Sequence, residues 1–201
     1  MIKSGRLKVI GELIGEKPKR NSSLSIGSKY VDFNTINLDV KHSPGLDIIA
    51  DARHLPFKQD SFELILFTDV IEHLPEDEED NALKEIHRTL RSNGRVILST
   101  PNDRFLFKYL DPSFWLIKHR HYKNHDIRKF LENNNFKIES IFTSGGWWAC
   151  AGNLWHCVIT YPLNRILNRK IMPSLIEKME NKEYNFQKND NGYTIYVKAI
   201  K

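Results

Sequence analysis

Apolar residues occur along the chain in short runs first and at helical spacing later, and these two patterns mark the expected elements. The short runs of the first half lie at residues 23–27, 34–40, 46–52, 62–70 and 95–102. The run "FELILFTDV" at 62–70 is almost continuously apolar, as expected of a strand that is buried on both faces of a sheet. The pattern predicts five strands in this half of the chain.

Between the fourth and fifth runs the period changes to that of an amphipathic helix. Leu83, Ile86 and Leu90 fall on one face of this helix. Acidic residues lie at its front and basic residues toward its back, an arrangement that suits the helix dipole. Asn93 and Gly94 then supply a left-handed residue that would end the helix.

The second half of the chain continues the alternation. Residues 125–136 predict a helix, and residues 137–144 and 193–200 predict strands. Strands separated by helices indicate the α/β class. We expect a Rossmann-like, doubly wound and mostly parallel sheet with helices on both faces and an antiparallel closing strand.

Composition adds bounds on domain count and function class. At 201 residues, 40% of them hydrophobic, the chain can bury one core, so we expect a single domain over 1–201. Within it we expect an N-terminal arm or helix over 1–20 and a helical insertion or cap over 145–190. Cys150 and Cys157 fit no metal spacing and predict two reduced, buried thiols.

Charge and hydropathy limit the kinds of partner and the location that we expect. The net charge is +5, but the 30 basic and 25 acidic residues are interspersed, so nucleic-acid binding is not favoured. The N-terminus is too charged for a secretory signal, and no apolar run reaches the roughly 18 residues of a membrane span. We therefore expect a cytoplasmic protein, and the sequence leaves the oligomeric state open.

Acidic residues follow neighbouring strands at the point where each strand ends. Parallel sheets bind ligands at this edge. Asp39 ends the second strand, where it could accept hydrogen bonds from a ribose diol or simply cap a turn. Asp51 ends the third strand, where it could accept from an adenine amine or form a salt bridge to Arg53. Two such acids beside the glycine turn at Gly27 predict a nucleoside site.

A resemblance supports this prediction. The segments "ADARHLPF", "VIEHL" and "RTLRSNGRVILSTPN" occur in this order, and the chain over roughly 23–102 resembles the class I S-adenosylmethionine-dependent methyltransferases. The likeness continues more loosely through "HYKNHDIRKFLENNNF". It implies S-adenosyl-L-methionine as cofactor, with Asp39 on the ribose, Asp51 on the adenine amine and Ala52 beside the ring. It also implies that Thr68 lines the methionine side and that Gly27 lets the backbone approach it.

One part of the chain departs from that family. Where the family has a loop with three glycines, this chain reads "SIGSKYVDF" and keeps only Gly27. Lys29 stands where the second glycine belongs, and it could replace the lost loop amides by binding the cofactor carboxylate. The 12 positions from Gly27 to Asp39 leave no room for the family's usual helix between the first two strands.

Two further stretches carry candidate chemistry. Trp147, Ala151, Leu154, Trp155 and Val158 form one helical stripe, which indicates a core helix, an acceptor lid or an interfacial helix with peripheral membrane contact. The histidines of "HRHYKNH" fit no compact metal motif, so no metal site is expected.

Two functions follow from these features. The first is a methyltransferase for a small-molecule or glycan-linked or lipid-linked acceptor, with His73 or His121 as the catalytic base. For His73 a structural role is the alternative. The second is a decayed methyltransferase-fold module that keeps only nucleoside or partner binding. A nicotinamide dehydrogenase ranks behind both, because the chain has no G-x-G-x-x-G.

Overall fold

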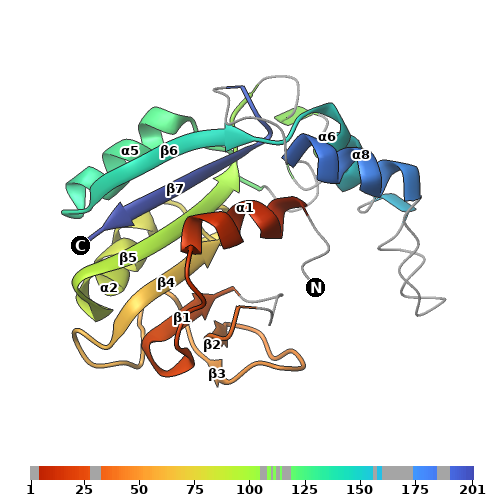
Figure 1. The fold of residues 1–201 in the computed structure, drawn as a ribbon. Coiled ribbons are helices and arrows are strands. Elements are labelled where there is room, and N and C mark those ends of the chain that lie inside the picture. Colours follow the sequence, from red (N-terminus) through yellow and green to blue (C-terminus); the bar gives the residue numbers. More distant parts are fainter. Residues whose placement is uncertain are drawn as a thin grey trace.

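The computed structural model describes most of the chain (Figure 1). The described residues are 5–27, 33–104, 108–109, 111, 114, 119–155, 158–159, 174–184 and 191–201. Lys29 and Cys157, both named above, lie outside these residues. Cys150 is a buried free thiol, and burial raises its pKa to about 11.

The centre of the fold is a seven-stranded sheet in the order β3-β2-β1-β4-β5-β7-β6. The strands are β1 Ser23–Ile26, β2 Ile36–Asp39, β3 Ile48–Ile49, β4 Phe62–Thr68, β5 Leu90–Pro101, β6 Lys137–Ser144 and β7 Thr194–Ile200. The first five strands pair in parallel. Strand β7 lies between β5 and β6 and is antiparallel to both. The predicted α/β fold with a mostly parallel sheet and an antiparallel closing strand is confirmed.

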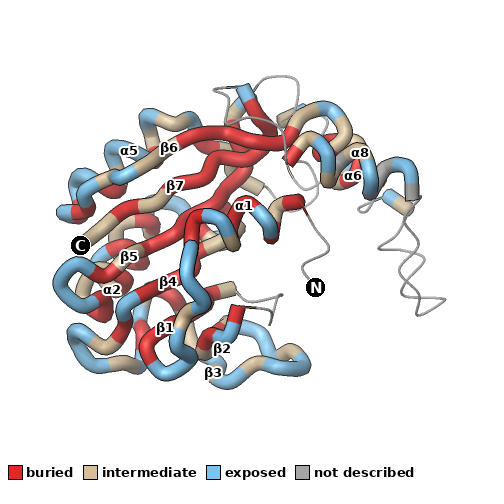
Figure 2. The backbone as a smooth tube through the Cα atoms, in the orientation of Figure 1, coloured by how far each residue is buried: buried red, intermediate tan, exposed pale blue. Residues whose placement is uncertain are grey.

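Helices cover both faces of this sheet (Figure 1). Helices α2 Glu79–Thr89 and α5 Asn124–Asn133 lie on one face; α1 Gly5–Ile14, α6 Trp147–Trp155 and α8 Ser174–Tyr184 lie on the other. Strand β4 shows why the continuous apolar run is needed. Ile65 and Phe67 pack with the first set, whereas Leu64 and Leu66 pack with the second. Figure 2 shows the resulting buried centre of the sheet.

Three boundaries differ from the sequence prediction. Strand β3, at one edge of the sheet, is only two residues long and pairs with β2 alone. Helix α2 ends at Thr89, before the predicted stop, and β5 begins directly after it. Asn93 does have the predicted left-handed backbone, with φ of 62°, but it turns the chain within β5 rather than ending the helix.

Helix α6 buries a different face from the apolar stripe that the sequence predicted. Its buried residues are Ala149, Cys150 and Gly152, whereas Trp147 of the predicted stripe is 56% exposed. Glu183 of α8 holds the start of α6, because its carboxylate accepts hydrogen bonds from the backbone N–H groups of residues 146, 148 and 149 at 2.9–3.0 Å. Within the described part of the chain, no helix combines the length and the apolarity that crossing a membrane requires.

Candidate functional site

The strand ends that carry the predicted cofactor residues lie side by side at one edge of the sheet. The strand order β3-β2-β1-β4 places the segments of Asp51, Asp39, Gly27 and Thr68 in this sequence along the edge. The Gly27 N–H donates to the carbonyl of Leu38 at 2.8 Å, which joins the ends of β1 and β2. The sheet therefore brings the four strand ends together as predicted.

Gly27 is required at the end of β1 for two reasons. Its φ is +74°, a left-handed conformation that other residues adopt only at a cost. A Cβ at this position would lie 2.2 Å from a methyl carbon of Val70, which belongs to the segment after β4. Gly27 thus lets the backbone turn while Val70 packs against the strand end.

Asp39 and Asp51 differ in how far the fold engages them. One oxygen of the half-buried Asp39 carboxylate accepts from the Lys41 N–H at 2.9 Å. Both Asp51 oxygens accept from Arg53: the guanidinium donates at 2.7–3.1 Å and the backbone N–H at 2.9 Å. These hydrogen bonds hold the pKa of Asp51 below its usual value. Ala52, which follows Asp51 in the sequence, is buried.

A polar cluster that sequence reasoning missed follows β4. Thr68 ends the strand half-buried, and Asp69 after it has a left-handed φ of 55°. The Asp69 carboxylate accepts from the Ser99 hydroxyl at 3.0 Å and pairs with Arg6 of α1. The local sequence gives no signal for the Arg6 contact, because the two residues are 63 positions apart.

Glu72 and His73 lie in a short 3-10 helix, η2 Ile71–His73. The Glu72 side chain is fully buried, and burial, with a smaller contribution from nearby Asp69, raises the pKa of its carboxyl well above the usual value. The Thr100 hydroxyl donates to one Glu72 oxygen at 3.1 Å. His73 is exposed, and its Nε2 lies 3.2 Å from Nε2 of His119.

His121 is held differently from His73. Its side chain has no exposed surface. Its Nε2 lies 3.1 Å from Asp111 and its Nδ1 lies 3.3 Å from the Asn102 carbonyl. Both ring nitrogens therefore have protein partners in this structure. The role of either histidine as a base stays a prediction, and His73 is the more accessible of the two.

Arg120 and Tyr122 fix the segment of these histidines over η2. Arg120 pairs with Glu79 and donates to the carbonyl oxygens of Ile71 and Leu74. The Tyr122 hydroxyl donates to Glu79 at 2.9 Å. Residues 119–122 are thereby held against the carboxyl end of the sheet, although their partners lie more than 40 positions earlier.

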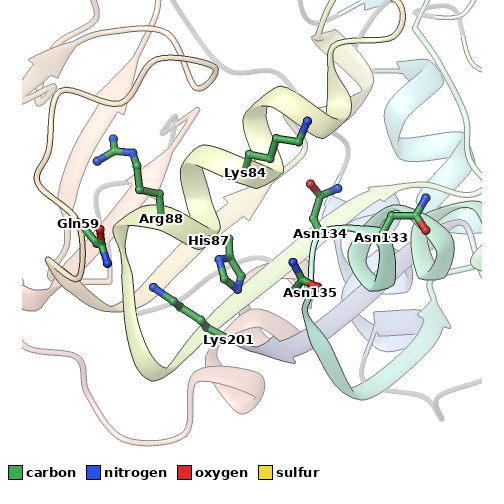
Figure 3. Close-up of a pocket in the computed structure, with 8 residues that line it drawn as sticks. All are labelled: Gln59, Lys84, His87, Arg88, Asn133, Asn134, Asn135 and Lys201. Atoms are coloured by element: carbon green, nitrogen blue, oxygen red, sulfur yellow. The ribbon is translucent and has the colours of Figure 1, made fainter.

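Two cavities lie on opposite edges of the sheet. The one of about 290 Å³ is lined by residues of the histidine segment, including His119, His121 and Phe114. The larger one, about 430 Å³, is shown in Figure 3 with lining residues such as Gln59, His87 and Lys201. These three lie where β4 and β5 begin and β7 ends, on the edge away from the predicted cofactor residues. We assign the functional site to the carboxyl edge, because ligands bind there in parallel α/β sheets.

Comparisons with known proteins bear on the family and the fold. Residues 28–98 match the methyltransferase domain family. An uncharacterised protein of Methanocaldococcus jannaschii is 37% identical over 84 residues, which cover 38% of this chain and 36% of that protein. The match thus spans little more than a third of the length of that relative.

Solved structures share the fold over nearly the whole chain. The [4+2]-cyclase SpnF superposes with a TM-score of 0.63 at 16% identity, covering 98% of this chain and 80% of the other. An S-adenosylmethionine-dependent methyltransferase from Archaeoglobus fulgidus gives 0.61 at 14% identity, covering 98% and 95%. These likenesses show the fold.

Residues 28–98 thus match a methyltransferase domain family, and the fold is that of solved methyltransferases, in line with the resemblance seen in the sequence.

Proposed function

We propose that this protein transfers a methyl group from S-adenosyl-L-methionine to a small-molecule, glycan-linked or lipid-linked acceptor. The proposal rests above all on one observation. The left-handed Gly27 directly precedes the segment that matches the methyltransferase family and Asp39 lies inside it; the two residues end neighbouring strands that hydrogen-bond to each other. This is the pair of features that a nucleoside site in a parallel sheet needs.

The residues at this edge fit the cofactor in part without rearrangement. Asp39 uses one oxygen for its own turn and can accept from ribose hydroxyls with the other. Buried Ala52 offers an apolar contact for the adenine ring. Asp51 already accepts four hydrogen bonds from Arg53, which is the capacity of a carboxylate. Binding of the adenine amine therefore requires the Arg53 guanidinium to move aside.

The chain's main task in the reaction is to position the reactants. The cofactor supplies a methyl carbon that its sulfonium already activates, so alignment and exclusion of water carry much of the rate enhancement. An acceptor hydroxyl must also lose a proton, and the exposed His73 is the side chain at this edge that can take it.

The second candidate function is a binding module that keeps the fold without transfer. The saturated Asp51 carboxylate favours this alternative, as does the loss of the family's second and third glycines from the loop after β1.

Calorimetry separates the two candidates from a protein that binds no cofactor. The purified chain is titrated with S-adenosylmethionine, with S-adenosylhomocysteine and, as a control, with NAD. We expect heat from the first two ligands and none from NAD. A silent titration at millimolar S-adenosylhomocysteine would refute the proposed enzyme. Binding without any transfer to a panel of hydroxyl and amine acceptors would favour the binding module.

A further inference from the structure

Five side chains that the predicted cofactor site does not use gather beside η2. We call them the His119 cluster: Glu72, His73, Asp111, His119 and His121. They come from three separate stretches of the chain. Two sets of three share His119, and in each set the ligand atoms all lie within 4.8 Å of one another. The first set is Glu72, His73 and His119, and the second is Asp111, His119 and His121. Imidazole nitrogens and carboxylate oxygens are the ligands of divalent transition metals in proteins.

In the set of Glu72, His73 and His119, one oxygen of Glu72 lacks a hydrogen-bond partner among the described residues. The Glu72 side chain is fully buried, and the oxygen in question is Oε1. His119 Nε2 lies 3.7 Å from this oxygen, beyond hydrogen-bond distance. Leaving a buried carboxylate oxygen unpaired costs free energy that few native sites tolerate. A cation between Glu72 and His119 would remove that cost.

The distances suit such an ion. His73 Nε2 and His119 Nε2 lie 3.2 Å apart. An ion about 2.1 Å from each nitrogen would bind them at an angle of about 100°, between the octahedral and tetrahedral values. Glu72 Oε1 completes a set of two histidines and one carboxylate, which zinc and non-haem iron(II) both use with positions left open.

The other carboxylate of the cluster lies behind His119. Asp111 Oδ2 lies 3.1 Å from His121 Nε2 and 3.5 Å from His119 Nδ1, a nitrogen that makes no hydrogen bond among the described residues and that a small shift would bring within reach of Asp111. A carboxylate on the far nitrogen of a ligating histidine orients the ring and raises its basicity. Asp111 therefore serves better as an orienting group than as a ligand.

We propose that Glu72, His73 and His119 bind a divalent transition-metal ion of the zinc or iron(II) type, and that Asp111 orients His119 toward it. This metal site does not depend on the cofactor. The arrangement could not be found from sequence spacing, because the fold joins His73 to a histidine 46 positions later.

A role for the ion rests on the proposed function. His119 also lines the cavity of about 290 Å³, so open coordination positions would border a space for the acceptor. A coordinated hydroxyl becomes more acidic and gives its proton to water, so with the ion bound His73 acts as a ligand and no longer as the base. Its oxygen lone pair then forms the bond to the methyl carbon, while the carbon–sulfur bond breaks and its electron pair stays on sulfur. The acceptor class indicated is a hydroxyl compound.

Metal titration without cofactor tests the site. The protein is stripped with a chelator, then titrated with Zn²⁺ by calorimetry and with Co²⁺ by visible absorption, with Mg²⁺ as a control for oxygen-only binding. We expect one equivalent of Zn²⁺ or Co²⁺ to bind per chain. Asp111→Asn should weaken binding by about 10- to 100-fold, and His73→Ala and His119→Ala by at least as much.

The controls make a negative result decisive. His73 is exposed, so His73→Ala should fold even if His119→Ala does not; His125→Ala removes a histidine that is 73% exposed and outside the cluster. His125→Ala should bind like the wild type. The proposal fails if the wild type binds no stoichiometric metal, if His73→Ala binds normally, or if only His121→Ala loses binding. Titrating the stripped protein with S-adenosylhomocysteine tests the proposed function separately.

Discussion

At the scale of single residues, Asp39 and Asp51 show two ways in which a strand-end carboxylate can be used. The fold engages Asp39 through one turn hydrogen bond, whereas Arg53 engages both oxygens of Asp51. Sequence position predicted both acids as ligands and left the salt bridge to Arg53 open for Asp51. The structure shows that salt bridge, and ligand binding by either acid stays a prediction.

Removing either carboxylate should weaken cofactor binding. A hydrogen bond between a carboxylate and a neutral donor contributes about 1.5–3 kcal/mol, so Asp39→Ala and Asp51→Ala should each raise the Kd for S-adenosylhomocysteine by roughly 10- to 100-fold. Calorimetry measures the change. The matched control is Glu132→Ala, which removes an exposed carboxylate of α5. Folded variants with unchanged Kd would remove these acids from the site.

Arg53→Ala should have the opposite effect. If the guanidinium must leave Asp51 before adenine binds, its removal should tighten adenosine binding by about two- to fivefold, the range that exposed ion pairs support. Arg20→Ala, which breaks the ion pair with Asp47, is the control. Weaker adenosine binding by Arg53→Ala would instead mean that Arg53 itself contacts the ligand.

Gly27 can be tested against a glycine of matched conformation. Gly15 has φ of +75°, but a Cβ added there would have no atom within 4 Å, whereas a Cβ on Gly27 would meet Val70. Gly15→Ala should cost only the left-handed backbone penalty of about 1–2 kcal/mol. Gly27→Ala should cost more, with part of the loss recovered by adding Val70→Ala. Urea denaturation measures both, and equal losses would show that Val70 gives way freely.

At the scale of elements, periodicity predicted those strands and helices that the sheet buries. Strands β4 and β6 match their predicted runs closely, because burial on both faces or strict pairing fixes them. The predicted third strand shrinks to Ile48–Ile49 at the other edge of the sheet, where only two residues pair with β2. Helix α6 buries its small residues Ala149, Cys150 and Gly152 and leaves Trp147 exposed, an arrangement that an apolar stripe alone does not indicate.

A core role for Trp147 of α6 and an exposed lid or interfacial role predict different losses of stability when this side chain is truncated. Trp147→Ala should change the free energy of unfolding by less than about 1 kcal/mol, because the ring is more than half exposed. Phe142→Ala, in the core that α6 packs against, should cost about 3–5 kcal/mol. Equal costs in thermal or chemical unfolding would support core packing of Trp147.

At the scale of the whole molecule, the predicted cofactor residues and the acceptor side differ in how far the sequence could predict them. The family match covers residues 28–98, so Asp39, Asp51 and Thr68 lie inside it and Gly27 directly precedes it. The His119 segment, α6 and α8 lie beyond it. Sequence could predict the first part from a shared pattern. It could not predict the contacts of the second part, because His119, for example, comes beside Glu72 only through the fold.

A crystal structure of the complex with S-adenosylhomocysteine tests the central claim most directly. The account predicts the ribose hydroxyls within hydrogen-bond distance of Asp39, the adenine ring against Ala52, and the Arg53 guanidinium turned away from Asp51. A nucleoside bound in the 430 Å³ cavity at the opposite edge, beside His87 and Lys201, would contradict it.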